Sequence, residues 1–172
     1  GDALQYASKK FRGDREVVLA AVQAVESYQC ALEYASKELK ADHEIVLAAV
    51  QNRTSSLCPL EYASKELRGD REIVLAAVQN DGDALEYARK KLKADREIVL
   101  AAVQSWGWAF KYASKELRAD RKIVMEAVKE RGKALRYASK ELRADRKIIA
   151  AAIEWRSEAL EYALDRKFVL AA

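Results

Sequence analysis

The sequence contains few of the residues that break helices or build metal and disulfide sites. Its 172 residues include one proline, one histidine and two cysteines. Two cysteines cannot form the disulfide framework of a small secreted domain, and their scarcity favours an intracellular location, in the cytoplasm or an organelle. Uniformly apolar runs such as residues 98–103 stop at six residues, whereas a bilayer span needs about 20. We therefore expect no transmembrane span in this stretch, although peripheral association with a membrane complex stays open.

A repeated segment fills the chain instead. Sequences similar to ALEYASKELRADREIVLAAVQ recur, and their tyrosines are spaced by 28, 28, 25, 25, 25 and 25 residues. Repeats of this length are typical of helical solenoids. The spacing predicts one array without separate domains, and we expect it to be part of a longer array. Its units lie at about residues 1–23, 24–51, 52–79, 80–104, 105–129, 130–154 and 155–172.

Each unit has the pattern of two short helices. In the fourth unit, Asp83 is the predicted cap of the first helix, and Glu86 completes a capping box three residues later. Asp95 is the predicted cap of the second helix, whose apolar residues cover most of its circumference. Glycines after each second helix are expected to end it in a left-handed conformation. These glycines are Gly82, Gly107 and Gly132.

Stacking is required because helices of about ten residues are marginal alone in water. A neighbouring copy covers the apolar second helix, which predicts an all-α fold, an α-solenoid of about seven two-helix repeats. The repeated tyrosines are expected to be core spacers whose hydroxyls reach the rim. The seventh unit lacks five residues after Tyr162, so we expect one continuous helix from about Glu158 in place of its hairpin.

The repeat motif L-x-Y-A-S-K-E-L-R-x-D-R-E-I-V-L-A-A-V resembles the tandem repeat called domain of unknown function 4116. The resemblance covers the first six units well and the shortened seventh only in part. It implies a helical-repeat fold and transfers no catalytic or binding residue. The family occurs notably in unicellular algae and other protists, which suggests an accessory subunit of an organellar or photosynthetic complex.

Unusual side chains collect in the predicted linkers between units. Trp106, Trp108 and Trp155 are the strongest candidates for partner contact, although packing over neighbouring helix ends would also explain them. Trp108 stands where the fourth unit has Asp83, its predicted cap. Variable aromatic residues along one edge of a regular array indicate a protein-binding edge.

Basic residues are concentrated in the fifth and sixth units, each of which has a net charge of +3. Glutamates at the third residue of the first helix, such as Glu86, are replaced there by Lys111 and Arg136. Arg131 and Lys133 add to the excess. An acidic partner would explain this charge, and so would unselected divergence of duplicated units.

No residue pattern predicts a catalytic, cofactor or metal site. His43 occupies a slot that holds arginine in other units, so we expect a surface substitution rather than a general base. Cys30 and Cys58 are expected to be free thiols because stacked helices lie too far apart for a disulfide. The leading hypothesis is a non-catalytic scaffold or linker that binds other proteins. The alternative is nucleic-acid or anionic-surface binding through the fifth and sixth units, although a base-reading code is disfavoured because equivalent surface positions barely vary.

Overall fold

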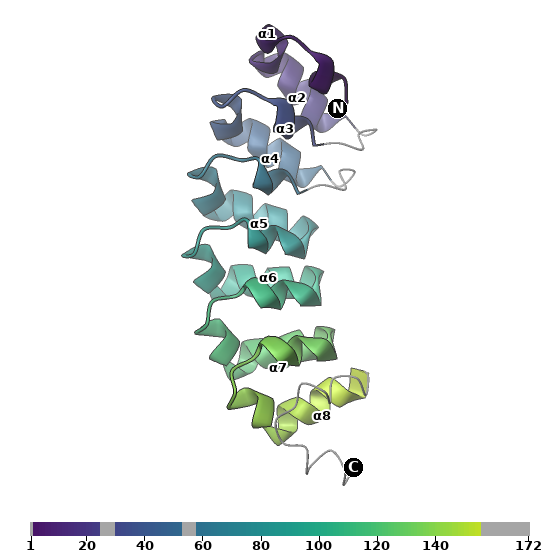
Figure 1. Ribbon diagram of the computed structural model, residues 1–172, viewed down its shortest axis with the longest axis vertical. Helices are drawn as coiled ribbons and strands as arrows, with labels where there is room; N and C mark the ends of the chain where they lie inside the picture. Colours follow the sequence, from purple (N-terminus) through teal and green to yellow (C-terminus); the bar gives the residue numbers. More distant parts are fainter. Residues whose placement is uncertain (1, 25–29, 53–57, 156–172) are drawn as a thin grey trace.

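The computed structural model describes residues 2–24, 30–52 and 58–155, and it shows six units stacked in chain order along one axis (Figure 1). Each long helix packs on the long helix of the next unit. This arrangement confirms the predicted all-α solenoid. No helix in the described part of the chain is long and apolar enough to cross a bilayer. The single helix predicted from about Glu158 lies outside the described residues.

Every described unit consists of two short helices followed by one longer α-helix. The longer helices are α2 (Arg15–Gln23), α4 (His43–Gln51), α5 (Arg71–Asn80), α6 (Arg96–Ser105), α7 (Arg121–Glu130) and α8 (Arg146–Trp155). The first short helices are η1 (Asp2–Tyr6), α3 (Ala31–Tyr34), η3 (Pro59–Glu61), η5 (Gly82–Glu86), η7 (Gly107–Tyr112) and η9 (Gly132–Tyr137). The second short helices are α1 (Lys9–Arg12), η2 (Leu39–Ala41), η4 (Leu67–Gly69), η6 (Leu92–Ala94), η8 (Leu117–Ala119) and η10 (Leu142–Ala144).

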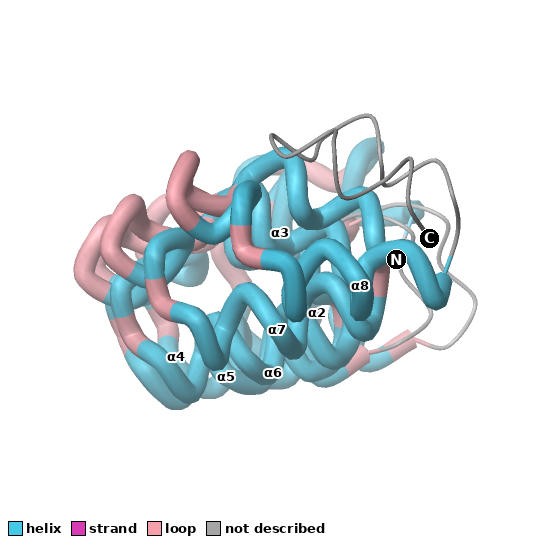
Figure 2. The backbone as a smooth tube through the Cα atoms, turned by 90° about the horizontal axis from the view of Figure 1, so that it is seen from below, coloured by secondary structure: helices cyan, strands magenta, loops and turns pink. Residues whose placement is uncertain are grey.

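The longer helices form one layer and the short helices form the other (Figure 2). The turns between the two short helices of each unit gather along one side, which we call the turn edge. Each longer helix starts near this edge and runs across the array to the opposite side, the linker edge, where the next unit begins. A ten-residue helix such as α6 separates the two edges by about 15 Å.

The predicted caps of the longer helices are confirmed. The Asp95 side chain accepts hydrogen bonds from the backbone amides of Glu97 and Ile98, at 3.0 and 3.2 Å. Each such cap satisfies backbone donors that have no partner within the helix and stabilises it by about 1 kcal/mol. The same pair of hydrogen bonds is made by Asp14, Asp70, Asp120 and Asp145, and Asp42 accepts from the amide of Ile45 alone.

The prediction of one continuous first helix per unit is wrong, because a turn divides it into two short pieces. In the third unit, the backbone amide of Ser64 donates to the carbonyl of Lys40 in the preceding unit, at 2.8 Å. That amide is therefore lost to the helix of its own unit. The Ser64 hydroxyl then accepts from the amide of Leu67 at 3.3 Å, which starts the second piece.

The capping box and the glycine caps predicted at the linkers are also wrong. Asp81, not Asp83, accepts the capping bond, from the amide of Asp83 at 3.0 Å. No described glycine has a positive φ. Gly82 is needed for close approach instead: a Cβ there would lie 2.3 Å from the Ala102 carbonyl oxygen and 2.8 Å from Trp106 Cβ.

The core runs without interruption along the described array. From the second unit on, each long helix buries two adjacent β-branched residues and an alanine one turn later; in α6 the buried residues are Ile98, Val99, Ala102 and Val103, all 0% exposed. In the first unit Val18 and Val22 are buried, whereas Val17 is 37% exposed. Burying such a Val or Ile side chain contributes about 1.5–3 kcal/mol. Since a neighbouring unit supplies much of this cover, the units depend on one another.

Ion pairs link successive units on the surface of the long-helix layer. Arg71 pairs with Asp95 of the next unit at 3.3 Å and also with Glu97. Equivalent ion pairs with the capping aspartate of the next unit are formed by Arg15, Arg96 and Arg121. His43 replaces the arginine between the second and third units, as predicted for a surface substitution, and lies 3.9 Å from Asp70.

Candidate binding site on units five and six

One slot at the linker edge carries a different residue in each of three successive units. Asp81, Trp106 and Arg131 each follow the last residue of a longer helix, in α5, α6 and α7 respectively. Because the units are stacked, side chains 25 residues apart come together. The Arg131 guanidinium carbon lies 5.3 Å from the centroid of the Trp106 ring and 4.8 Å from that of Trp108. Both distances are within the range of cation–π attraction.

Gly107 allows this approach. A Cβ at residue 107 would lie 2.9 Å from the Cβ of Arg131 and 3.4 Å from that of Glu130. A side chain here would push the linker of the sixth unit away from the fifth. The glycine therefore positions Arg131 against the tryptophans.

Trp108 extends the group across the short-helix layer. Its ring meets Tyr137 edge to face, with centroids 6.3 Å apart and planes at 76°. Trp108 is half-buried, whereas Trp106 keeps 44% of its surface exposed. The two tryptophans thus have different roles: Trp108 packs between units, and Trp106 presents an exposed aromatic face.

Tyrosine contacts change at the same point in the array. In the fourth unit Glu86 accepts a hydrogen bond from the Tyr112 hydroxyl at 2.5 Å. Tyr87 is paired with Glu61 of the preceding unit in the same way. Burial, and then Glu61, raise the pKa of Tyr87 to about 12. In the fifth unit Lys111 occupies the slot of Glu86 and lies over the ring of Tyr112 instead, 4.4 Å from its centroid.

The sixth unit repeats this cation–tyrosine contact. The Arg136 guanidinium carbon lies 5.1 Å from the centroid of the Tyr137 ring. Lys111 is also 3.8 Å from Asp83, one oxygen of which is buried without a hydrogen bond in the described structure. Burial raises the pKa of Asp83, and Lys111 opposes this shift.

Four of the seven predicted partner-binding residues are joined by ring contacts with Tyr137, and a fifth, Lys111, stacks on Tyr112 in the same short helix as Trp108. We call this group the aromatic–basic strip. It consists of Trp106, Trp108, Lys111, Arg131 and Arg136, together with Tyr112 and Tyr137. Lys133 is half-buried in the slot equivalent to Trp108 and has interactions of its own. Trp155 is the last residue of α8, and its side chain lies outside the described part.

The two cysteines are free thiols, as predicted. Burial raises the pKa of Cys30 to about 11 and that of Cys58 to about 12. Thiols with such pKa values are poor nucleophiles near neutral pH, so neither residue adds reactive chemistry to the site.

Sequence reasoning missed two basic grooves at the turn edge, each between neighbouring units. The groove between units five and six has a volume of about 540 Å³, and its basic residues are Lys115, Arg118, Arg136 and Lys140. Tyr137 lines it too, which connects this groove to the aromatic–basic strip.

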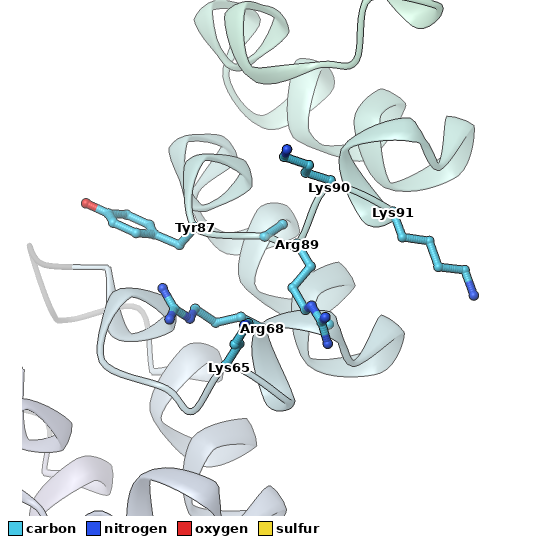
Figure 3. Close-up of a pocket in the computed structure, with 8 residues that line it drawn as sticks. Lys65, Arg68, Tyr87, Arg89, Lys90 and Lys91 are labelled. Atoms are coloured by element: carbon cyan, nitrogen blue, oxygen red, sulfur yellow. The ribbon is translucent and has the colours of Figure 1, made fainter.

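The groove between units three and four is larger, at about 600 Å³ (Figure 3). Its basic residues are Lys65, Arg68, Arg89, Lys90 and Lys91. The fourth unit has no net charge, since acidic residues such as Asp81 and Asp83 at its linker edge offset these bases. A comparison slot by slot would have found the groove: Arg89 and Lys91 stand where most units have serine and glutamate.

The repeat is shared with a known family. The family described as domain of unknown function (DUF4116) matches residues 23–68, 54–93, 70–118, 95–143 and 120–166. These overlapping matches cover most of the chain, which therefore belongs to this family. Comparisons with curated proteins and with solved structures gave no match.

Proposed function

We propose that this array is a non-catalytic scaffold that binds a protein partner through its aromatic–basic strip. The observation that carries the proposal is the exposed face of Trp106, held beside Arg131 on a rigid stack of helices. Trp, Tyr and Arg dominate the binding energy of protein interfaces. A surface tryptophan that departs from the repeat motif adds nothing to the core of the solenoid.

The strip is organised before a partner arrives. Arg131 is held by two aromatic rings, and Trp108 is held by Tyr137. Side chains that are already ordered lose less conformational entropy on binding. The half-buried Arg131 and the exposed Arg136 beside the rings favour a partner with acidic residues next to an apolar anchor. An accessory role inside the cell, in an organellar or photosynthetic complex, is the setting that we propose.

The test compares proteins captured from the native cell extract by the wild-type array and by a Trp106→Ala/Trp108→Ala variant. A partner identified with the wild type is then purified and its affinity measured directly. We expect the double variant to bind about 30-fold more weakly, the loss of about 2 kcal/mol typical of an interface hot spot. Tyr6→Ala is the matched control, because Tyr6 is an exposed aromatic residue at the other end of the array, 84% exposed.

Circular dichroism must show the same helix content and melting for all three proteins. Trp106→Ala alone separates binding from packing, since only Trp108 contacts Tyr137. Equal affinity of every captured partner for the wild type and the double variant would contradict the proposal.

A second candidate function is binding of nucleic acid or another anionic surface by units five and six. The groove between these units supports it, because Arg118 lines the groove with its Nε buried and without a hydrogen bond. Binding of this kind weakens steeply as salt is added. Retention on heparin or DNA that does not change with salt, or no retention at all, would exclude it.

A further inference from the structure

Basic side chains from two units meet in the groove between units three and four. Figure 3 shows Lys65 and Arg68 of the third unit next to Arg89 of the fourth, with Lys90 and Lys91 extending away on either side. The remaining lining consists of Gly69, Tyr87 and Ala88, and none of it is acidic. The volume of about 600 Å³ falls in the usual range for small-molecule sites, about 300–1,000 Å³.

The base at one slot of this groove does not make the backbone contact that the same slot makes in the first, second and fourth units. Lys40 and Lys93 fold back and donate to backbone carbonyls of their own units, at 2.7 and 2.6 Å. Arg12 does the same in the first unit, at 2.7 Å. Arg68 holds this slot in the third unit, is half-buried, and makes no side-chain hydrogen bond or ion pair within the described residues. Its guanidinium thus keeps its donors for a ligand.

Arg89 is accommodated by a change in the preceding unit. Its aliphatic stem passes over Gly69, where an added Cβ would lie 2.6 Å from Arg89 Cδ. Later units have alanine at the slot of Gly69 and serine at that of Arg89, as in the pair Ala119 and Ser139. Glycine also holds this slot in the first unit, opposite Ser36. The change specific to this groove is therefore Arg89, and Gly69 leaves room for its stem.

The glutamate that most units have in the turn between their two short helices is replaced by Lys91 in the fourth unit. In the third unit Glu66 is held by its own backbone amide and by Ser64, which lower its pKa, with a smaller effect from Arg89. In the fourth unit the equivalent residue is Lys91. Two substitutions thus remove a serine–glutamate pair and add two cations. None of the five groove cations forms an ion pair with a described residue.

From this geometry we infer that the groove between units three and four binds a compact, soluble polyphosphorylated molecule. Clustered phosphates suit it because guanidinium groups bind phosphate in a bidentate manner and lysines add mobile positive charge. A compact ligand is favoured over a long polyanion because the five basic residues that line this groove come from only two adjacent units.

The experiment is calorimetric titration with inositol hexakisphosphate in about 100 mM salt, where the Debye length is about 10 Å. The test variant is Arg89→Ser/Lys91→Glu, which restores the residues of units two, three, five and six and should therefore fold. The control is Lys122→Glu/Lys129→Gln, which restores the residues of the fourth unit in α7. Both double variants lower the net charge by three.

We expect the wild type to bind with a saturable isotherm, the test variant to bind at least about tenfold more weakly, and the control to stay within about twofold. A tenfold change corresponds to about 1.4 kcal/mol. Equal weakening in both variants would show attraction by net charge alone and overturn the inference. So would a wild type without saturable binding, or one that binds only vesicles carrying phosphorylated inositol lipids. A single-stranded oligonucleotide that displaces the probe and binds more tightly would identify a nucleic acid as the occupant, and would also overturn it.

Discussion

Units two to four and units five to six share one backbone and differ in how their short helices meet. In the earlier units a glutamate faces the tyrosine of the next unit, and Glu86 hydrogen bonds to Tyr112. In the later units Lys111 and Arg136 lie over tyrosine rings, and tryptophans enter the linker edge. The buried residues of the long helices are the same in both regions: α5, α6 and α7 each bury an isoleucine, two valines and an alanine at equivalent positions. The array can therefore vary the surface positions of its short-helix layer without loss of the core, because the buried positions stay apolar in both regions.

The largest expected effect is on stability, from a change to a buried core side chain in the later region. Phe110 is completely buried in the fifth unit, at the slot that holds Leu85 in the fourth. Phe110→Ala should lower the free energy of unfolding by about 3–5 kcal/mol, since it removes buried area and leaves a cavity. Urea denaturation followed by circular dichroism measures the loss.

Phe110→Leu is the matched control, because it restores the residue of neighbouring units. We expect it to cost less than about 1.5 kcal/mol. If both changes were equally costly, the fifth unit would depend on the ring itself, and its core would differ in kind from that of the fourth.

The second prediction concerns close approach at the linker edge. Gly82→Ala should cost about 1–3 kcal/mol, because the new Cβ would lie 2.3 Å from the Ala102 carbonyl oxygen. Gly13→Ala should be neutral or stabilising by up to about 1 kcal/mol, since the nearest atom to its Cβ would be 3.6 Å away. Thermal melting of the two variants distinguishes a steric requirement from a general need for glycine.

The third prediction separates the two kinds of tyrosine contact. Tyr112→Phe removes a hydroxyl that donates to Glu86 and should cost about 0.5–1.5 kcal/mol. Tyr137→Phe should cost close to nothing, because Tyr137 contacts Trp108 and Arg136 through its ring. Equal losses in denaturant titrations would contradict the distinction between the regions.

The fourth prediction is a pH dependence that comes from buried tyrosines paired with glutamate. Burial, with Glu33 next in effect, raises the pKa of Tyr62 to about 12, and Tyr87 reaches about 12 as well. A raised pKa means that folding favours the protonated phenol. This stabilisation is present below the unfolded pKa of about 10 and is lost as the pH rises through about 12. Stability measured from pH 9 to 12 should fall less steeply in Tyr62→Phe/Tyr87→Phe than in the wild type.

The smallest effect concerns the ion pairs between long helices. His43→Arg restores the residue that other units use, and arginine stays charged at every working pH. We expect a gain of less than about 1 kcal/mol at pH 8, because the pair with Asp70 is exposed to solvent. A gain that persists in 1 M salt would contradict this origin, since screening should remove it.

Prediction from sequence succeeded where the signal is local or periodic. Asp95 and its equivalents were identified as caps, and the apolar pattern of α6 placed Ile98 and Val99 in the core. It failed at the linker, where Asp83 looked like a cap, yet Asp81 has that role. It also failed in the first helix, where the amide of Ser64 is bound by the preceding unit. The tryptophans were singled out as departures from the motif. Their contact with Arg131 was not foreseen, because stacking brings together residues 25 positions apart.

The sequence by itself determined the repeat, the α-helix in each unit and the apolar face that makes the units stack. These features depend on period and on caps, which act over a few residues. Only the tertiary structure decided that the first helix breaks, because the amide of Ser64 is bound by the neighbouring unit. It also decided which cations meet in the grooves, since the distance between side chains of adjacent units is set by how closely the stacked backbones approach.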